Sequence, residues 1–305
     1  DKLIGMCKTE KEDYEKYWDD ISPFIKYGCL RDTKFCDKMN DYILFKDIND
    51  KYLTLPELLK AEEEKKDEEN ADEKGEDASA ENTEDSADTV SDENTADNAD
   101  KDTRKTIYYV TDVNQQGQYI RMFKESGMNA VILDHNIDTS FITQLEQRNQ
   151  NYKFMRIDAD VTDALKEEVS EEDLKDALDS LTEIFRKALE KDKLDVKVEK
   201  LKDTSVASVI TLNEEGRRMQ DMMKMYNMYG MDPSMFGGNE TLTLNVSNPL
   251  VQYILEHKDS EHVPVFCKQL YDLAMLSNQP LSPEAMTAFV NRSNEIMLIL
   301  ANKEK

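Results

Sequence analysis

The 305-residue sequence contains few of the residues and patterns that build catalytic centres, metal sites and membrane spans. It has 9 glycines, and neither G-x-G nor G-x-x-x-x-G-K occurs, which argues against a phosphate-binding loop. The 3 histidines and 4 cysteines lack metal-ligand spacing, so we predict no metal site, and we expect buried, reduced thiols. No apolar run approaches the roughly 18 residues of a membrane span. No secretory signal pattern is present at the start.

Basic residues are also scarce. Lys and Arg number 39 against 65 Asp and Glu, giving a formal net charge of −26. This excess argues against nucleic acid and anionic membranes as partners, because both need clustered Lys and Arg. Much of the acidity lies in residues 60–104, where Val90 is the only sizeable apolar residue and no aromatic residue occurs. We predict a disordered acidic insertion there, with an acidic segment that binds basic partners as the alternative.

Residues 1–59 are predicted to be a helical segment. Thr9-x-x-Glu12 and Thr54-x-x-Glu57 match the capping-box pattern that begins many helices, and Gly28 is expected to end the first helix. Strand–helix alternation follows, with strands at 107–110, 130–133 and 154–157 and helices at 116–125 and 139–147. This alternation predicts a small α/β/α subdomain with a parallel sheet over residues 105–168.

Residues 169–305 are predicted to form a third folded part. We expect a helix that begins at Ser170, strands at 196–198, 205–212 and 242–246, and helices at 214–229, 261–276 and 283–302. Ser282 is the expected cap of the last helix, with Pro283 in its first turn. The predicted fold class is therefore α+β: a helical segment, the α/β/α subdomain, and an α+β C-terminal domain that ends in a helix pair.

Methionine is the one residue type that is locally concentrated. Seven of the 15 methionines lie between Met219 and Met235, and a single helical face accommodates only part of them. Flexible methionine suits surfaces that bind varied apolar partners, although core packing and membrane contact stay open as alternatives. The candidate residues for binding non-native polypeptides are Met222, Met223, Met225, Met228, Tyr229, Met231, Met235 and Phe236.

The last two predicted helices carry more apolar surface than the preceding sheet is expected to cover. Pairing with the same helices of a second chain would give a four-helix bundle, and packing within one chain is the alternative. The candidate dimer-interface residues are Phe266, Leu270, Leu273, Met286, Phe289, Val290, Ile296, Met297 and Leu300.

Several segments taken together resemble the heat-shock protein 90 molecular chaperones, and most of all their bacterial members. Each segment is weak evidence alone, but they occur in the family's order. They are Tyr14-Glu15-Lys16-Tyr17-Trp18, Thr54-Leu55-Pro56-Glu57, Ile107-Tyr108-Tyr109-Val110-Thr111, Asn136-Ile137-Asp138, Met219 to Lys224, Asn248-Pro249-Leu250-Val251 and Leu270 to Ser277.

The resemblance implies a homodimeric chaperone of the bacterial cytoplasm, active in the stress response, that binds non-native proteins. In this family ATP and Mg²⁺ bind an N-terminal domain, and a middle-domain arginine reaches the γ-phosphate. We expect both elements to lie outside this chain, so no catalytic or cofactor-binding residue is assigned. The resemblance makes the helix at 219–229 client-facing and the last helices the dimer bundle. It leaves the acidic insertion unexplained. A non-catalytic interaction module that uses this insertion, and a small-molecule enzyme on the α/β unit, are the alternatives.

Overall fold

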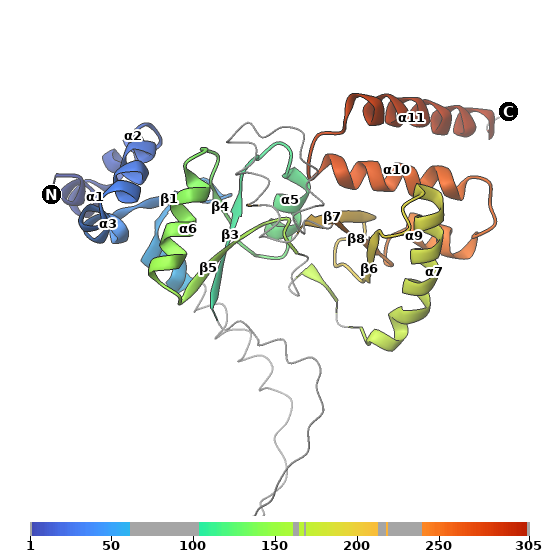
Figure 1. Cartoon of the computed structure of the whole chain (residues 1–305), viewed down its shortest axis with the longest axis horizontal. Coiled ribbons are helices and arrows are strands. Elements are labelled where there is room, and N and C mark those ends of the chain that lie inside the picture. Colours follow the sequence, from blue (N-terminus) through green and yellow to red (C-terminus); the bar gives the residue numbers. More distant parts are fainter. Residues whose placement is uncertain are drawn as a thin grey trace, which may run out of the picture. The chain divides into compact units, whose positions relative to one another are not determined.

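The computed structural model describes residues 2–61, 104–160, 165–167, 169–212, 218 and 240–303. Contacts between residues divide the chain into two compact units. Figure 1 shows the helices and strands of the chain. The first unit comprises residues 1–45, 52–107 and 140–154, and the second comprises 46–51, 108–139 and 155–305. The domain boundaries predicted after residues 59, 104 and 168 stay predictions. No helix in the described ranges is long and apolar enough to cross a membrane.

The first unit begins with three helices, α1 (Lys2–Thr9), α2 (Lys11–Arg31) and α3 (Thr33–Met39), followed by a short 3-10 turn, Asn40–Tyr42. Two short strands that the sequence did not predict, β1 (Leu44–Lys46) and β2 (Tyr52–Thr54), then pair with each other. Tyr14 and Trp18 are buried with their ring centroids 5.3 Å apart. The Tyr14 hydroxyl donates a 2.9 Å hydrogen bond to the Tyr42 carbonyl, which ties α2 to the 3-10 turn.

Two predicted helix boundaries in this unit are wrong. The Thr9 hydroxyl donates back to the Gly5 carbonyl at 2.9 Å, so it belongs to α1 and does not cap α2. Helix α2 also continues past Gly28 to Arg31. A Cβ atom at Gly28 would lie only 2.9 Å from the Phe35 ring, so the glycine permits the close approach of α2 and α3.

The second predicted capping box is confirmed. The Thr54 amide donates to Glu57 Oε2 at 2.7 Å, and the Glu57 amide donates back to Thr54 Oγ1 at 3.4 Å. Residues 55–61 are helical, as this box predicts.

The predicted βαβαβ unit is also confirmed. Strands β3 (Lys105–Val110), β4 (Val131–Ile132) and β5 (Tyr152–Arg156) form a sheet in the order β4-β3-β5. Strands β3 and β4 are parallel, with Tyr109 opposite Val131. Helices α5 (Gly117–Glu125) and α6 (Asp138–Arg148) make the two connections. Gly127 adopts φ 68°, which suits the turn that follows α5.

The C-terminal part of the second unit is built on a mixed sheet. Helix α7 (Glu171–Leu189) precedes β6 (Asp195–Glu199), β7 (Ser208–Leu212) and β8 (Glu240–Asn245). Their order is β6-β8-β7, with β6 parallel and β7 antiparallel to β8. Helices α9 (Pro249–Glu256), α10 (Val263–Leu276) and α11 (Pro283–Lys303) follow. The fold class is therefore α+β, as predicted.

The described residues of the second unit include two apolar cores. The larger joins the sheet to α7, α9 and α10, and includes Phe185, Leu242, Leu244 and Ile254. The smaller joins α5 to the segment before β7 and to β7 itself, and includes Met122, Phe123, Val206 and Val209. Burying a large apolar side chain contributes about 1.5–3 kcal/mol. The smaller core therefore attaches α5 firmly to the C-terminal sheet.

Candidate functional site

Of the two surfaces predicted from the sequence, one lies outside the described residues and the other can be placed in the structure. The candidate client-binding residues Met222, Met223, Met225, Met228, Tyr229, Met231, Met235 and Phe236 all lie outside the described residues. Most of the acidic insertion at 60–104 does so too. The candidate dimer residues lie on α10 and α11 and can be placed.

Helix α11 begins where the sequence predicts. The Ser282 hydroxyl accepts a hydrogen bond from the Ala285 amide at 3.2 Å, and the Ser282 carbonyl accepts one from the Met286 amide at 2.8 Å. Pro283 occupies the first helical position, where its missing N–H costs nothing. The start of α11, and with it the phase of its apolar residues, is therefore fixed by local chemistry.

Helix α11 exposes a line of apolar side chains. Met286, Val290, Met297 and Leu300 are 38%, 47%, 58% and 61% exposed. Together with Ser293 they follow a 4-3-4-3 spacing, which is the spacing of a coiled-coil contact line. We call Met286, Val290, Met297 and Leu300 the apolar seam. An exposed line of this kind marks a surface that associates with another apolar element.

The other candidate dimer residues differ in accessibility. Phe289 and Ile296 are half-buried beside it. On α10, Leu273 is 45% exposed, whereas Leu270 is only 4% exposed and packs in the larger core. Phe266 is partly buried against the same core and lies edge-to-face with Tyr253, with ring centroids 5.8 Å apart. Leu270 therefore faces the core of its own chain.

Four polar side chains connect α10 to α11. Arg292 forms an ion pair with Asp272, and its Nε donates to Gln269 Oε1 at 3.0 Å. The side-chain Nε2 of Gln269 donates to the Ser293 hydroxyl at 3.0 Å, and that hydroxyl donates to the Phe289 carbonyl at 2.8 Å. We call Gln269, Asp272, Arg292 and Ser293 the polar bridge. Beside it a groove of ≈ 300 Å³ opens between α10 and α11.

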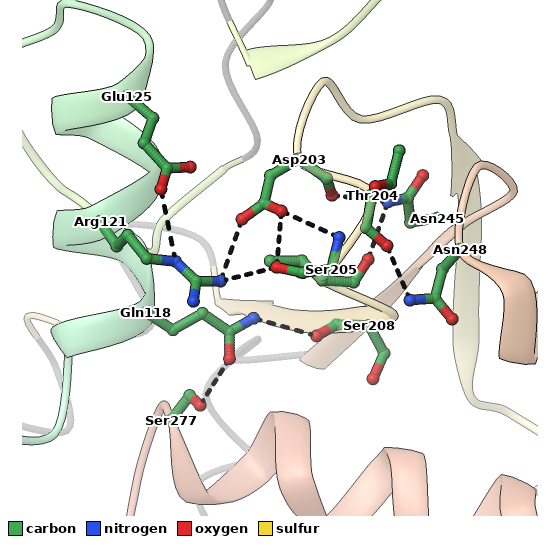
Figure 2. Close-up of polar contacts among 11 residues, drawn as sticks. Gln118, Arg121, Glu125, Asp203, Thr204, Ser205, Ser208, Asn245, Asn248 and Ser277 are labelled. Atoms are coloured by element: carbon green, nitrogen blue, oxygen red, sulfur yellow. Dashed lines mark hydrogen bonds and ion pairs between the residues drawn. The ribbon is translucent and has the colours of Figure 1, made fainter.

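The opposite end of α10 is tied to the α/β part of the unit. The Ser277 hydroxyl, just after α10, donates to Gln118 Oε1 on α5 at 3.1 Å (Figure 2). The neighbouring Asn278 donates to Asp158 Oδ2 at 3.2 Å and to the Ile210 carbonyl at 3.3 Å. Asp158 is fully buried and forms two 2.8 Å hydrogen bonds with Arg156. The turn after α10 therefore contacts three elements at once.

A second polar cluster joins α5 to the loop before β7. Arg121 donates to Asp203 Oδ2 at 3.0 Å and to the Ser205 hydroxyl at 3.1 Å (Figure 2). Burial opposes ionisation of Asp203, but hydrogen bonds from Ser205 and the charge of Arg121 outweigh it and lower the pKa of this carboxyl. The carboxylate form of Asp203 therefore helps to hold α5 against the loop.

The side chain of Asn245 also holds the loop before β7, through hydrogen bonds to the backbone. Its side chain is fully buried; the oxygen accepts from the Leu201 and Ser247 amides at 3.0 Å each, and the nitrogen donates to the Asp203 and Val206 carbonyls at 3.0 and 2.7 Å. All four bonds are made to backbone groups. Sequence reasoning did not single out Asn245, because its partners depend on the fold.

Among the residues that the structure describes, Asp134, His135 and Asp138 form the one acidic cluster with ligand atoms within 4.8 Å of one another. Asp138 Oδ2 accepts from the His135 amide at 3.1 Å, and His135 Nδ1 lies 2.8 Å from Asp134 Oδ1. Asp134 and His135 are exposed. These contacts stabilise the turn that begins α6, which gives the cluster a structural role.

Comparison with known proteins gives a consistent result. The model of the family described as "Hsp90 protein" matches residues 97–304. The chain is 27% identical over 274 residues to "Chaperone protein htpG" of Bacteroides fragilis (strain YCH46), covering 86% of the chain and 34% of the relative. It is 25% identical over 294 residues to "Chaperone protein HtpG" of Porphyromonas gingivalis (strain ATCC 33277), covering 92% and 37%. For the protein of that name in Treponema denticola, the identity is 24% over 314 residues, covering 97% and 42%. The chain thus spans 34–42% of the length of these relatives.

Proposed function

Because the chain belongs to the Hsp90 protein family, we propose that it is part of a molecular chaperone that self-associates through its C-terminal helices and binds non-native polypeptides. The matched relatives carry the name chaperone protein. No residue of this chain is assigned to ATP or Mg²⁺, and we assign nucleotide binding and hydrolysis to other parts of a longer protein. The bacterial relatives support a cytoplasmic location.

The observation that carries the self-association is the apolar seam of α11. A helix of a monomeric protein buries its apolar stripe against its own core, whereas this helix leaves Met286, Val290, Met297 and Leu300 exposed. Two copies that paired α10 and α11 would bury both seams in a four-helix bundle, in the two-fold arrangement that is commonest among homodimers.

Sedimentation velocity of the full chain tests this proposal. We expect a dimer at ~10 μM, which corresponds to a dissociation constant in the micromolar range or tighter. Val290→Asp places a charge in the seam and should produce a monomer, because the charge would be desolvated in the bundle. The matched control is Asn291→Asp, which adds the same charge at the neighbouring exposed position, off the seam. A monomeric parent chain, or a dimeric Val290→Asp variant, would contradict the proposal.

Polypeptide binding is assigned to the methionine-rich segment between residues 219 and 236. The support is compositional, since methionine adapts its shape to many apolar partners. Replacing Met223, Met225 and Met228 with serine should weaken the suppression of aggregation of a chemically denatured test protein. Replacing Gln220 and Asn227 with serine is the control, because it alters the same segment without removing apolar side chains. Equal suppression by all three chains, with unchanged circular dichroism, would reject the assignment.

A further inference from the structure

Helix α2 exposes a group of aromatic side chains on its outer face. Tyr17, Phe24 and Tyr27 are 48%, 78% and 53% exposed, and Phe24 is the most exposed large apolar side chain in the described part of the chain. The inner face of α2 is already packed in its own unit, where Trp18 and Ile25 are buried. We call Tyr17, Phe24 and Tyr27 the aromatic line. Apolar side chains gathered on one exposed face mark a surface that contacts another molecule.

Charged residues extend the aromatic line at both ends with the same helical spacing. Asp13, Asp20 and Arg31 are exposed, and together with the three aromatic residues they follow a 4-3-4-3-4 spacing, which is the spacing of a coiled-coil contact line. At 3.6 residues per turn, all six side chains point within about 40° of one direction. We call these six residues the α2 contact line. Its N-terminal end is acidic and its C-terminal end is basic.

This order of residues makes the α2 contact line complementary to itself when two copies run antiparallel. With the two-fold axis level with Ser22, Asp13 of each copy lies opposite Arg31 of the other, and the two tyrosines of the line lie opposite each other. Phe24 lies opposite Asp20, and the positive edge of an aromatic ring tolerates a carboxylate. A parallel pair would instead place like charges opposite one another at both ends. The charge pattern therefore selects the antiparallel arrangement with a second copy of the chain.

The basic end of the α2 contact line is already ordered within one chain. Arg31 Nε donates to the Tyr27 hydroxyl at 3.1 Å, and the guanidinium lies 5.5 Å from the centroid of the Tyr27 ring. A guanidinium has five N–H donors, so the remaining ones can bind a carboxylate. Because Arg31 is held in place before it meets a partner, less side-chain entropy is lost when the ion pair forms.

We propose that the α2 contact line is a second self-association surface, which pairs antiparallel with the same line of a second copy of the chain. It is separate from the apolar seam, because α2 and α11 belong to different compact units. The expected dissociation constant is about 100 μM, because one helix pair buries little area and Asp20 of both copies lies near the axis. Two different two-fold surfaces on one chain would join dimers into larger assemblies.

Sedimentation velocity of the full chain with Val290→Asp isolates this surface, because that substitution disrupts the pairing proposed for the apolar seam. At ~0.1 M salt, distant charges are screened while closely opposed charges still interact. We expect monomers at ~10 μM and a substantial dimer fraction at ~200 μM. Phe24→Ala should weaken this association about tenfold. Val113→Ala is the control, because it shortens an exposed apolar side chain outside α2 and should change nothing.

Charge reversal tests the antiparallel arrangement. Asp13→Arg and Arg31→Asp each place like charges opposite one another, and each should weaken association about fivefold. The double reversal restores both ion pairs and should return association to the level before reversal. Glu12→Arg is the matched control, because it makes the same charge change at the neighbouring exposed position outside the contact line. It should not weaken association.

The outcomes separate this proposal from the one on the apolar seam. A Val290→Asp chain that stays monomeric at ~200 μM overturns the α2 surface, and so does unchanged association after Phe24→Ala. A double reversal that associates as weakly as the single variants overturns the antiparallel pairing. If the Val290→Asp chain is already a dimer at ~10 μM, the seam proposal fails; the α2 surface then stands only if Phe24→Ala reduces the association that remains.

Discussion

The buried amide of Asn245 allows a stringent test of how the second unit is held together. Asn245→Asp keeps the shape of the side chain and the oxygen that accepts from the Leu201 and Ser247 amides. It replaces the nitrogen, which donates to the Asp203 and Val206 carbonyls at 3.0 and 2.7 Å, with a second oxygen. Two carbonyl groups, that of Val206 in a buried place and that of Asp203 in a partly buried one, then lose their donors and face a carboxyl oxygen.

The magnitude follows from these two carbonyl groups. Each buried polar group left without a partner costs about 1–3 kcal/mol, so we expect Asn245→Asp to lower the free energy of unfolding by about 4 kcal/mol. This is a large part of the ~5–15 kcal/mol by which domains are stable. The measurement is urea unfolding followed by far-ultraviolet circular dichroism at pH 7.

The control for this experiment is Asn291→Asp, the same chemical change at an exposed position of α11. It should alter stability by no more than ~0.5 kcal/mol, as exposed substitutions usually do. If Asn245→Asp also costs less than ~1 kcal/mol, the hydrogen bonds of Asn245 do not hold the loop before β7.

Three further predictions concern single sites. Gly28→Ala gains about 1 kcal/mol of helix propensity but places a methyl group 2.9 Å from the Phe35 ring. Because such an overlap costs about 1–3 kcal/mol, the urea midpoint of unfolding measured by Trp18 fluorescence should fall. A higher midpoint would contradict this prediction. Because the pKa of Asp203 is lowered from its ordinary 3.8, its stabilising contribution is present above pH 3.8 and lost as pH falls through the lower native pKa; the cost of Asp203→Asn should therefore shrink in acid, and a cost independent of pH would refute this. Burial raises the pKa of the Cys29 and Cys267 thiols to about 12 each, so Ellman's reagent at pH 8 should label them only after unfolding, and rapid labelling of the folded chain would show that they are accessible.

The two capping-box patterns show what local sequence can and cannot predict. Thr54 and Glu57 bond to each other as the pattern requires, whereas Thr9 bonds back to Gly5. The difference lies in the preceding residues, because α1 extends to Thr9 and provides its hydroxyl with a nearer carbonyl partner. A four-residue pattern contains no information about whether a helix already precedes it.

The exposure of the candidate residues on α10 and α11 could be predicted only in part, for a similar reason. Spacing along α11 was sufficient to identify the apolar seam, because the period of a helix fixes which side chains share a face. Spacing also put Leu270 in the set, although it packs in its own core. The polar bridge could not be predicted, since Gln269 and Arg292 meet only when the rotation of α11 on α10 is known.

The turn between α10 and α11 has a mechanical consequence. Ser277 and Asn278 fasten this turn to α5, to β7 and to the end of β5, so it behaves as a pivot. Helix α11 has 21 residues and extends about 30 Å from there, at ~1.5 Å per residue. A tilt of about 10° at the pivot moves the far end of α11 by about 5 Å, which is one helical turn. The place at which the C-terminal ends of two seams can meet is therefore set by the geometry of Ser277 and Asn278, two residues that precede the helix.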